Sequence, residues 1–115
     1  MPNDKMEIVT TVGTREGQKI LALKGPLTIH TIFNFQIAVR EESKAAVIID
    51  FSNVPFMDSA GLGALVGARV ALQKANRELA IAGLDTQVKA LLDMSKVSQF
   101  FRIFPTVEEA QATVA

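Results

Sequence analysis

The sequence has no cysteine, no tryptophan and no tyrosine, and its single histidine is His30. Without cysteine, a disulfide framework, a thiolate metal site and a cysteine nucleophile are excluded, and the redox compartment is left open. A zinc ion would have only His30 and carboxylates as ligands. We therefore expect neither a metal ion nor a cofactor in this chain.

Net charge and long apolar runs are missing as well. Twelve basic side chains balance twelve acidic ones, so no long-range field gathers phosphate backbones or an anionic membrane surface. No run approaches the roughly 20 apolar residues that span a bilayer. The segment Met1–Glu7 is polar where a secretory signal would be basic and then apolar. We expect a cytoplasmic protein with no membrane insertion and no direct contact with nucleic acid.

The residues that are present describe a globular chain. It has 115 residues, of which 49% are apolar and 21% are charged. A chain of this size buries enough surface for one core without metal or disulfide support. Since no linker, repeat or low-complexity segment interrupts it, we predict a single domain over residues 1–115.

Hydrophobic periodicity and turn residues predict alternating strands and helices. Ala45–Phe51 is nearly continuously apolar, as in a central strand that is covered on both faces. The expected order is a hairpin of strands at 7–12 and 19–24, a helix over 31–42, the strand at 45–51, a helix from Asp58 or Ser59 to about Ala75, a strand over 78–83, a helix capped by Asp85, a short strand over 100–104, and a helix that opens at 105–106. This order predicts an α/β fold, a mixed sheet of four or five strands with helices packed against it.

The glycines at 61, 63 and 67 invite comparison with a dinucleotide-binding fingerprint. Their third glycine is one place late, and about ten residues separate Phe51 from Gly61, whereas the fingerprint follows its strand at once. We interpret these glycines as residues that let a helix pack closely and leave its exposed start flat.

Hydrolytic chemistry at Ser59 is excluded by two features. A nucleophile elbow needs glycine two places before the serine, where Met57 stands, and its histidine follows the serine, whereas His30 precedes it. His30 is expected at a helix entry. Asp50 and Asp58 have no histidine or lysine nearby to act with as an acid–base pair, so we expect Asp50 to bond loop amides and Asp58 either to cap a helix or to be recognised by a partner.

Taken alone, Ser59 is a plausible helix cap, because serine at a helix start accepts hydrogen bonds from free amides. The surrounding segment, however, is an aliphatic strand ending in Asp50, a short loop, and Asp-Ser-Ala-Gly-Leu-Gly-Ala-Leu over 58–65. This segment resembles the signature of the STAS family, the domain of bacterial anti-sigma-factor antagonists. The stretches 19–27, 78–84 and 102–110 are similar to other parts of the same family. The sequence departs from the family at Thr28, where aspartate is common, and at His30.

The resemblance implies a phosphorylation-switched binding module rather than an enzyme. It implies Ser59 as phosphoacceptor, a serine kinase that is also an anti-sigma factor as partner, and a phosphoserine phosphatase that resets the switch. The partner surface would comprise Asp58, Ser59, Ala60, Gly61 and Leu62. Unphosphorylated, the antagonist would bind the kinase and release the sigma factor. Two alternatives share the fold, a scaffold of a stressosome-like complex and a soluble subunit of a lipid or anion transporter.

Overall fold

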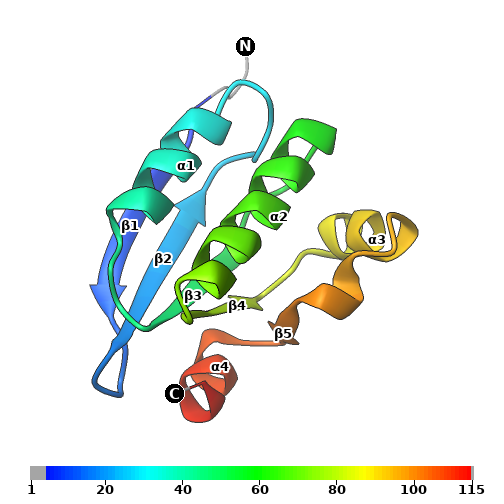
Figure 1. The fold of residues 1–115 in the computed structure, drawn as a ribbon. Coiled ribbons are helices and arrows are strands. Elements are labelled where there is room, and N and C mark those ends of the chain that lie inside the picture. The colour runs from blue at the N-terminus through cyan, green and yellow to red at the C-terminus, as the bar shows by residue number, and fades with distance from the viewer. Residues whose placement is uncertain (1–4, 115) are drawn as a thin grey trace.

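The computed structural model describes residues 5–114, so that Met1–Asp4 of the polar amino terminus and Ala115 lie outside the described residues. Strands and helices alternate along most of the chain (Figure 1). The elements are β1 (Glu7–Val12), β2 (Gln18–Lys24), α1 (Ile32–Glu41), β3 (Ala46–Asn53), α2 (Ser59–Lys74), β4 (Glu78–Ala82), α3 (Thr86–Met94), the 3₁₀ turn η1 (Ser98–Phe100), β5 (Arg102–Phe104) and α4 (Val107–Thr113).

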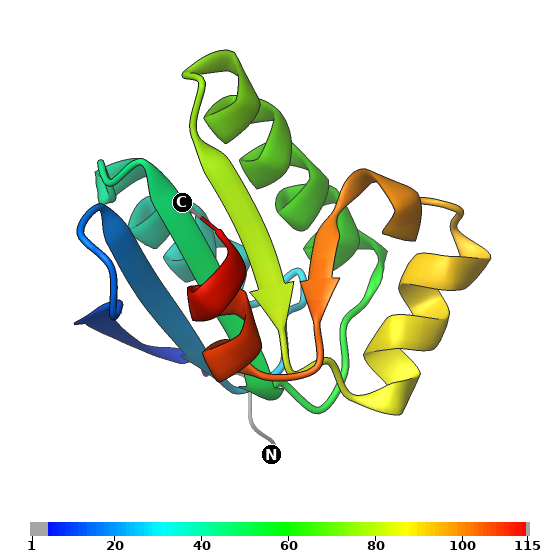
Figure 2. The same ribbon diagram turned by 90° about the horizontal axis from the view of Figure 1, so that it is seen from below.

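The sheet has the strand order β1-β2-β3-β4-β5, with β1 antiparallel to β2 and the other neighbours parallel. Crossovers between parallel strands are right-handed almost without exception. Because β2 to β5 follow one another in a single direction, that rule places α1 and α2 on the same face. Figure 2 shows α4 on the opposite face of the sheet, so the carboxyl-terminal helix covers the side that the crossovers leave open.

Two hydrophobic cores follow from the alternation of side chains along β3. Val47, Ile49 and Phe51 point into the larger core, which the sheet forms with α1, α2 and α3. Ile48 points the other way, into a smaller core beneath α4. All four side chains are at most 1% exposed. This double burial is the physical reason why the strand reads as a continuous apolar run.

The structure confirms the predicted mixed sheet, with five strands, and the helix predicted from Asp58 or Ser59 to about Ala75, which spans Ser59–Lys74. Asn76 follows that helix with a φ of 59°, the left-handed conformation expected of a stop residue. The prediction of a strand over 100–104 was wrong at its start, because Phe100 ends the 3₁₀ turn and β5 begins only at Arg102. The aromatic run resembles a strand, but the Phe100 amide bonds the Val97 carbonyl oxygen instead of a sheet neighbour.

The longest helix among the described residues is α2, with 16 residues. A bilayer needs about 20 apolar residues in one helix. Within residues 5–114, no helix is both long and apolar enough to cross a membrane.

Candidate functional site

The predicted site lies where the chain leaves β3 and enters α2, at the edge of the sheet where the parallel strands end (Figure 1). Asp58 is the N-cap of α2, in extended backbone conformation, and its Oδ1 accepts a hydrogen bond from the Gly61 amide (2.8 Å). The Leu62 amide bonds the Asp58 carbonyl oxygen (2.9 Å). An aspartate at this position satisfies amides that have no partner inside the helix. The capping role that sequence alone could assign to Ser59 therefore belongs to Asp58.

The second carboxylate oxygen of Asp58 ties this helix start to the loop between β2 and α1. Oδ2 accepts a hydrogen bond from the Ile29 amide (3.1 Å). Beside it, Leu27 and Met57 form a parallel bridge that extends the pairing of β2 and β3. The Leu27 amide donates to the Phe56 carbonyl oxygen (3.1 Å), and the Asp58 amide donates to the Leu27 carbonyl oxygen (3.3 Å). Residues 27–29 and 56–58, which are about 30 positions apart in the sequence, are thus held together, and we call them the platform.

Gly61 is the residue that lets the platform close. It is buried, and a Cβ at this position would collide with the Leu27 carbonyl oxygen and lie 2.8 Å from Cγ of Met57. Glycine is required because backbone meets backbone here, not because of its φ angle. The expectation of close packing is confirmed for Gly61, whereas Gly63 and Gly67 have open space where a Cβ would be. As a buried residue, Gly61 shapes the surface from beneath.

Ser59 is the first residue of α2 and is exposed. In the described part of the chain its hydroxyl has no hydrogen-bond partner, and the amides of Ser59 and Ala60 have no protein acceptor. The hydroxyls of Thr31 and Ser52, by contrast, are engaged: Thr31 is 1% exposed and donates to the Pro26 carbonyl oxygen (2.7 Å), and Ser52 donates to Asp50 (2.6 Å). Ser59 therefore presents a free hydroxyl beside two free amides at the positive end of a helix.

The remaining predicted contact residues are less accessible than Ser59. Asp58, Ala60 and Leu62 are half-buried, and Leu62 packs against the main core. The sequence analysis missed the apolar border of the site: Ile29 is 60% exposed and Phe56 is 49% exposed, and both belong to the platform. Phe33, in the first turn of α1, is 67% exposed. For Phe33 the available signal was the broad apolar stripe of residues 32–39, because a helix buries only one side. Ile29 and Phe56 lie outside that stripe.

The departures from the family pattern lie in the turn that precedes α1. Thr28 is 6% exposed, and its Oγ1 accepts a hydrogen bond from the His30 amide (3.2 Å). The hydroxyl thereby closes the local turn, as the side chain of aspartate also can. His30 is exposed in that turn, as expected of a helix-entry residue. Thr28 adds no charge to the surface around Ser59.

The two aspartates of the segment do not converge on one site. Asp50 follows Ile48 on the α4 side of β3, where its Oδ1 accepts bonds from the Ser52 amide (2.9 Å) and hydroxyl. There it lines a separate cavity of about 410 Å³ with Glu108. Asp58 points into the platform instead. Among residues 5–114 there is no cluster of three or more histidine, aspartate or glutamate side chains that could hold a metal ion.

Comparison with known proteins gives one family and a consistent set of relatives. The model of the STAS domain matches residues 7–110. The chain is 31% identical over 93 residues to the anti-sigma F factor antagonist of Paenibacillus polymyxa, covering 77% of each chain. An anti-sigma factor antagonist from Mycobacterium paratuberculosis superposes with a TM-score of 0.86 at 20% identity, over 98% of this chain and 97% of that one. A sulfate transporter family protein from Wolinella succinogenes superposes with a TM-score of 0.73 at 21% identity, over 89% and 86%.

Proposed function

The chain belongs to the STAS domain family, and we propose that it acts in that family as an anti-sigma factor antagonist whose binding is switched by phosphorylation of Ser59. The fold does not discriminate between the functions found in the family, because an antagonist and a transporter-family protein both superpose on it over most of their length. The sequence does discriminate. The relative that is 31% identical over most of both chains is an antagonist.

One structural observation carries the choice of Ser59. Its hydroxyl is exposed and unbonded, whereas the hydroxyls of Thr31 and Ser52 are already engaged. A kinase needs a hydroxyl that it can reach without breaking the fold. The Asp58 cap and the Gly61 contact hold the helix start independently of Ser59. Ser59 can therefore change its charge while the platform beneath it keeps its shape.

The partner is a kinase of serine that is also the anti-sigma factor, and the unphosphorylated domain binds it. Ile29 and Phe56 provide exposed apolar side chains on the platform, and such residues favour a protein interface. A phosphate on Ser59 would place about −1.5 to −2 charges next to the Asp58 carboxylate. Burying that unmatched charge in an interface costs several kcal/mol, so the partner dissociates. A phosphoserine phosphatase then restores the binding form.

The same site supports a binding protein rather than an enzyme. No side chain of the described residues is placed to act as a base on Ser59, and the carboxylate next to it is occupied by two amides. General acid–base catalysis needs a free group within hydrogen-bond reach of the reacting proton. We place catalysis of the phosphate transfer, and of its removal, on the partner proteins.

A capture experiment separates this function from the two alternatives that share the fold. The Ser59→Ala variant, immobilised and exposed to lysate of the native cell, should retain a protein with a kinase fold, and the Ser59→Asp variant should lose it. Recovery of transporter subunits or of a stressosome assembly by both variants alike would contradict the proposal. The recovered kinase, with ATP, should place a single phosphate on Ser59 of the unmodified domain, as located by mass spectrometry.

A further inference from the structure

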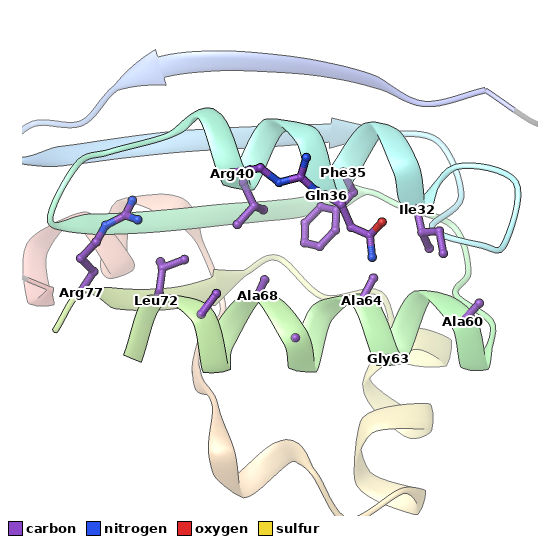
Figure 3. A pocket seen from close by; sticks show the side chains of 13 residues that line it. Ile32, Phe35, Gln36, Arg40, Ala60, Gly63, Ala64, Ala68, Leu72 and Arg77 are labelled. Carbon is purple, nitrogen blue, oxygen red and sulfur yellow. The ribbon is translucent and has the colours of Figure 1, made fainter. Parts of the chain in front are cut away.

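A groove separates α1 from α2 on the face of the domain that carries Ser59. It encloses about 720 Å³. Figure 3 shows Phe35 of α1 facing Ala64 and Ala68 of α2 across it, with Ala60 near one end and Leu72 and Arg77 near the other. A cavity of 300–1,000 Å³ that is apolar with a few polar groups has the size and character of a small-molecule site.

Contacts within the chain do not require the two glycines with which α2 lines the groove. Gly63 and Gly67 lie within α2, away from its ends, and are exposed to solvent. A Cβ at either position would meet nothing within 4 Å. Neither has a positive φ angle, and neither is in close contact with another segment. Glycine in a helix interior is unfavourable relative to alanine. Two such residues on one wall of a groove leave room for a molecule that lies against the helix backbone.

Two arginines line the groove (Figure 3): Arg40 is on the α1 side, with its guanidinium extending toward Gln36 over the middle of the groove, and Arg77 is at one end. The Arg77 guanidinium is held there by two carbonyl oxygens, with Nε donating to Lys44 and Nη2 donating to Glu42 (both 2.8 Å). Both acceptors are neutral backbone groups, so the charge of Arg77 is not cancelled by its own partners. Arg40 also lines the groove, and its guanidinium has no partner among the described residues. Gln36 is the only other polar side chain in the lining. No carboxylate lines the groove.

We propose that this groove binds an unbranched, long-chain carboxylate, with the alkyl chain between the helices and its negative charge balanced by the two arginines of the lining. The lining of α2 extends from Ala60 to Leu72, about 18 Å at 1.5 Å per residue. An extended alkyl chain advances about 1.25 Å per carbon, given carbon–carbon bonds of about 1.5 Å. The groove therefore accommodates about 12 to 14 carbons. The proposal does not rest on phosphorylation of Ser59, although the groove shares Ala60 with the predicted partner surface.

The test is calorimetric titration of the purified domain with dodecanoate, at concentrations at which dodecanoate stays monomeric. Affinity should rise with each CH₂ by up to about fourfold, the equivalent of about 0.8 kcal/mol, from octanoate to about tetradecanoate and then level off. Gly67→Leu should weaken dodecanoate binding at least tenfold by filling the groove, and Val70→Leu, on an exposed part of α2 outside the lining, should leave it unchanged. Thermal melting of both variants checks that each is folded.

The charge is tested separately from the shape. Arg40→Gln should weaken dodecanoate binding about tenfold and leave the binding of dodecan-1-ol unchanged, whereas Lys24→Gln, outside the groove, should affect neither. Absence of dodecanoate binding by the folded wild type, or equal binding by wild type and Gly67→Leu, would overturn the proposal. If the domain ignored dodecanoate while Gly67→Leu weakened capture of the kinase, the groove would be a protein-docking surface instead. Loss of Ser59 phosphorylation with intact dodecanoate binding would count against the proposed switch alone.

Discussion

At the scale of the residue, the structural contacts at the start of α2 are made by the neighbours of Ser59, the proposed phosphoacceptor. Asp58 caps the helix and ties it to the Ile29 amide, Gly61 permits contact with the Leu27 carbonyl oxygen, and Ser59 between them is exposed and unbonded. Since the structural work is done by its neighbours, Ser59 is free to be modified. This division also explains why a serine in a typical capping context is not the cap.

The close contact of Gly61 predicts that a side chain at this position destabilises the domain. Gly61→Ala should lower the free energy of unfolding by about 1 to 3 kcal/mol, because its Cβ would collide with backbone that cannot move without breaking the platform. Urea denaturation monitored by circular dichroism measures this loss. A Gly61→Ala variant as stable as wild type would mean that the Leu27 and Met57 loops are not held together as described.

Asp58 can be tested for its two roles at once. Asparagine caps helices about as well as aspartate, whereas alanine costs about 0.5 to 2 kcal/mol. Asp58→Asn should therefore keep nearly the wild-type stability, and Asp58→Ala should lose about 1 kcal/mol or more in the same denaturation experiment. If Asp58→Asn also keeps its affinity for the kinase, the aspartate acts through the helix start. Weaker binding by a stable Asp58→Asn variant would show that the partner contacts the charge.

At the scale of the element, α2 is destabilised by the low helix propensity of Gly67, which a single substitution can raise. Gly67 is exposed, with open space where a Cβ would be, so Gly67→Ala should stabilise the domain by about 0.5 to 1 kcal/mol through helix propensity alone. Calorimetric melting would detect this as a rise of a few degrees in Tm. A fall in Tm would indicate that the glycine is needed for the packing of α2 on the rest of the chain.

The elements themselves were largely predictable, for physical reasons that particular residues show. The helix at 59–74 has an aspartate cap, regularly spaced apolar side chains and Asn76 as its stop, all of which are local signals. The strand boundary at Arg102 was missed, because the turn at residues 98–100 is set by two backbone hydrogen bonds that an aromatic sequence does not reveal. For the site, the segment and its serine were predictable. The bridge of Leu27 to Met57 was not, since pairing across 30 residues has no local signature.

At the scale of the whole molecule, the hairpin of β1 and β2 holds the carboxyl-terminal helix in place. Gln18 is 1% exposed, and its Nε2 donates to the carbonyl oxygens of Gln111 (2.8 Å) and Val114 (3.0 Å). Arg15 donates to the carbonyl oxygens of Ala112 and Val114. These bonds satisfy carbonyl groups that have no partner at the end of α4. Residues almost 100 positions apart thereby close the second core over β3.

The hydrogen bonds from Gln18 and Arg15 form a clamp on α4, and this clamp predicts a large loss of stability from a substitution far from Ser59. Gln18→Leu should lower the free energy of unfolding by about 1 to 3 kcal/mol, because it removes the side-chain donor to the Gln111 carbonyl oxygen and one of the two donors to the Val114 carbonyl oxygen. Amide hydrogen exchange should increase first in α4, while α2 keeps its protection. A uniform change over both helices, or none, would contradict a clamp that is specific to α4. Phosphorylation of Ser59 by the kinase should still occur in the folded fraction.

The most direct test of the account is the affinity of the kinase partner for the domain before and after phosphorylation of Ser59. The phosphate gains about 0.3 to 1 kcal/mol from the helix dipole and the free amides and loses a similar amount to repulsion by Asp58, so domain stability should hardly change. In the interface, desolvation of the phosphate should weaken binding by several kcal/mol, which is a hundredfold or more in Kd. We therefore predict that isothermal titration gives tight binding for the unmodified domain and for Ser59→Ala, and binding at least a hundredfold weaker for phosphorylated Ser59, with an unchanged Tm. Equal Kd values for the phosphorylated and unmodified forms, or phosphate on a residue other than Ser59, would contradict it.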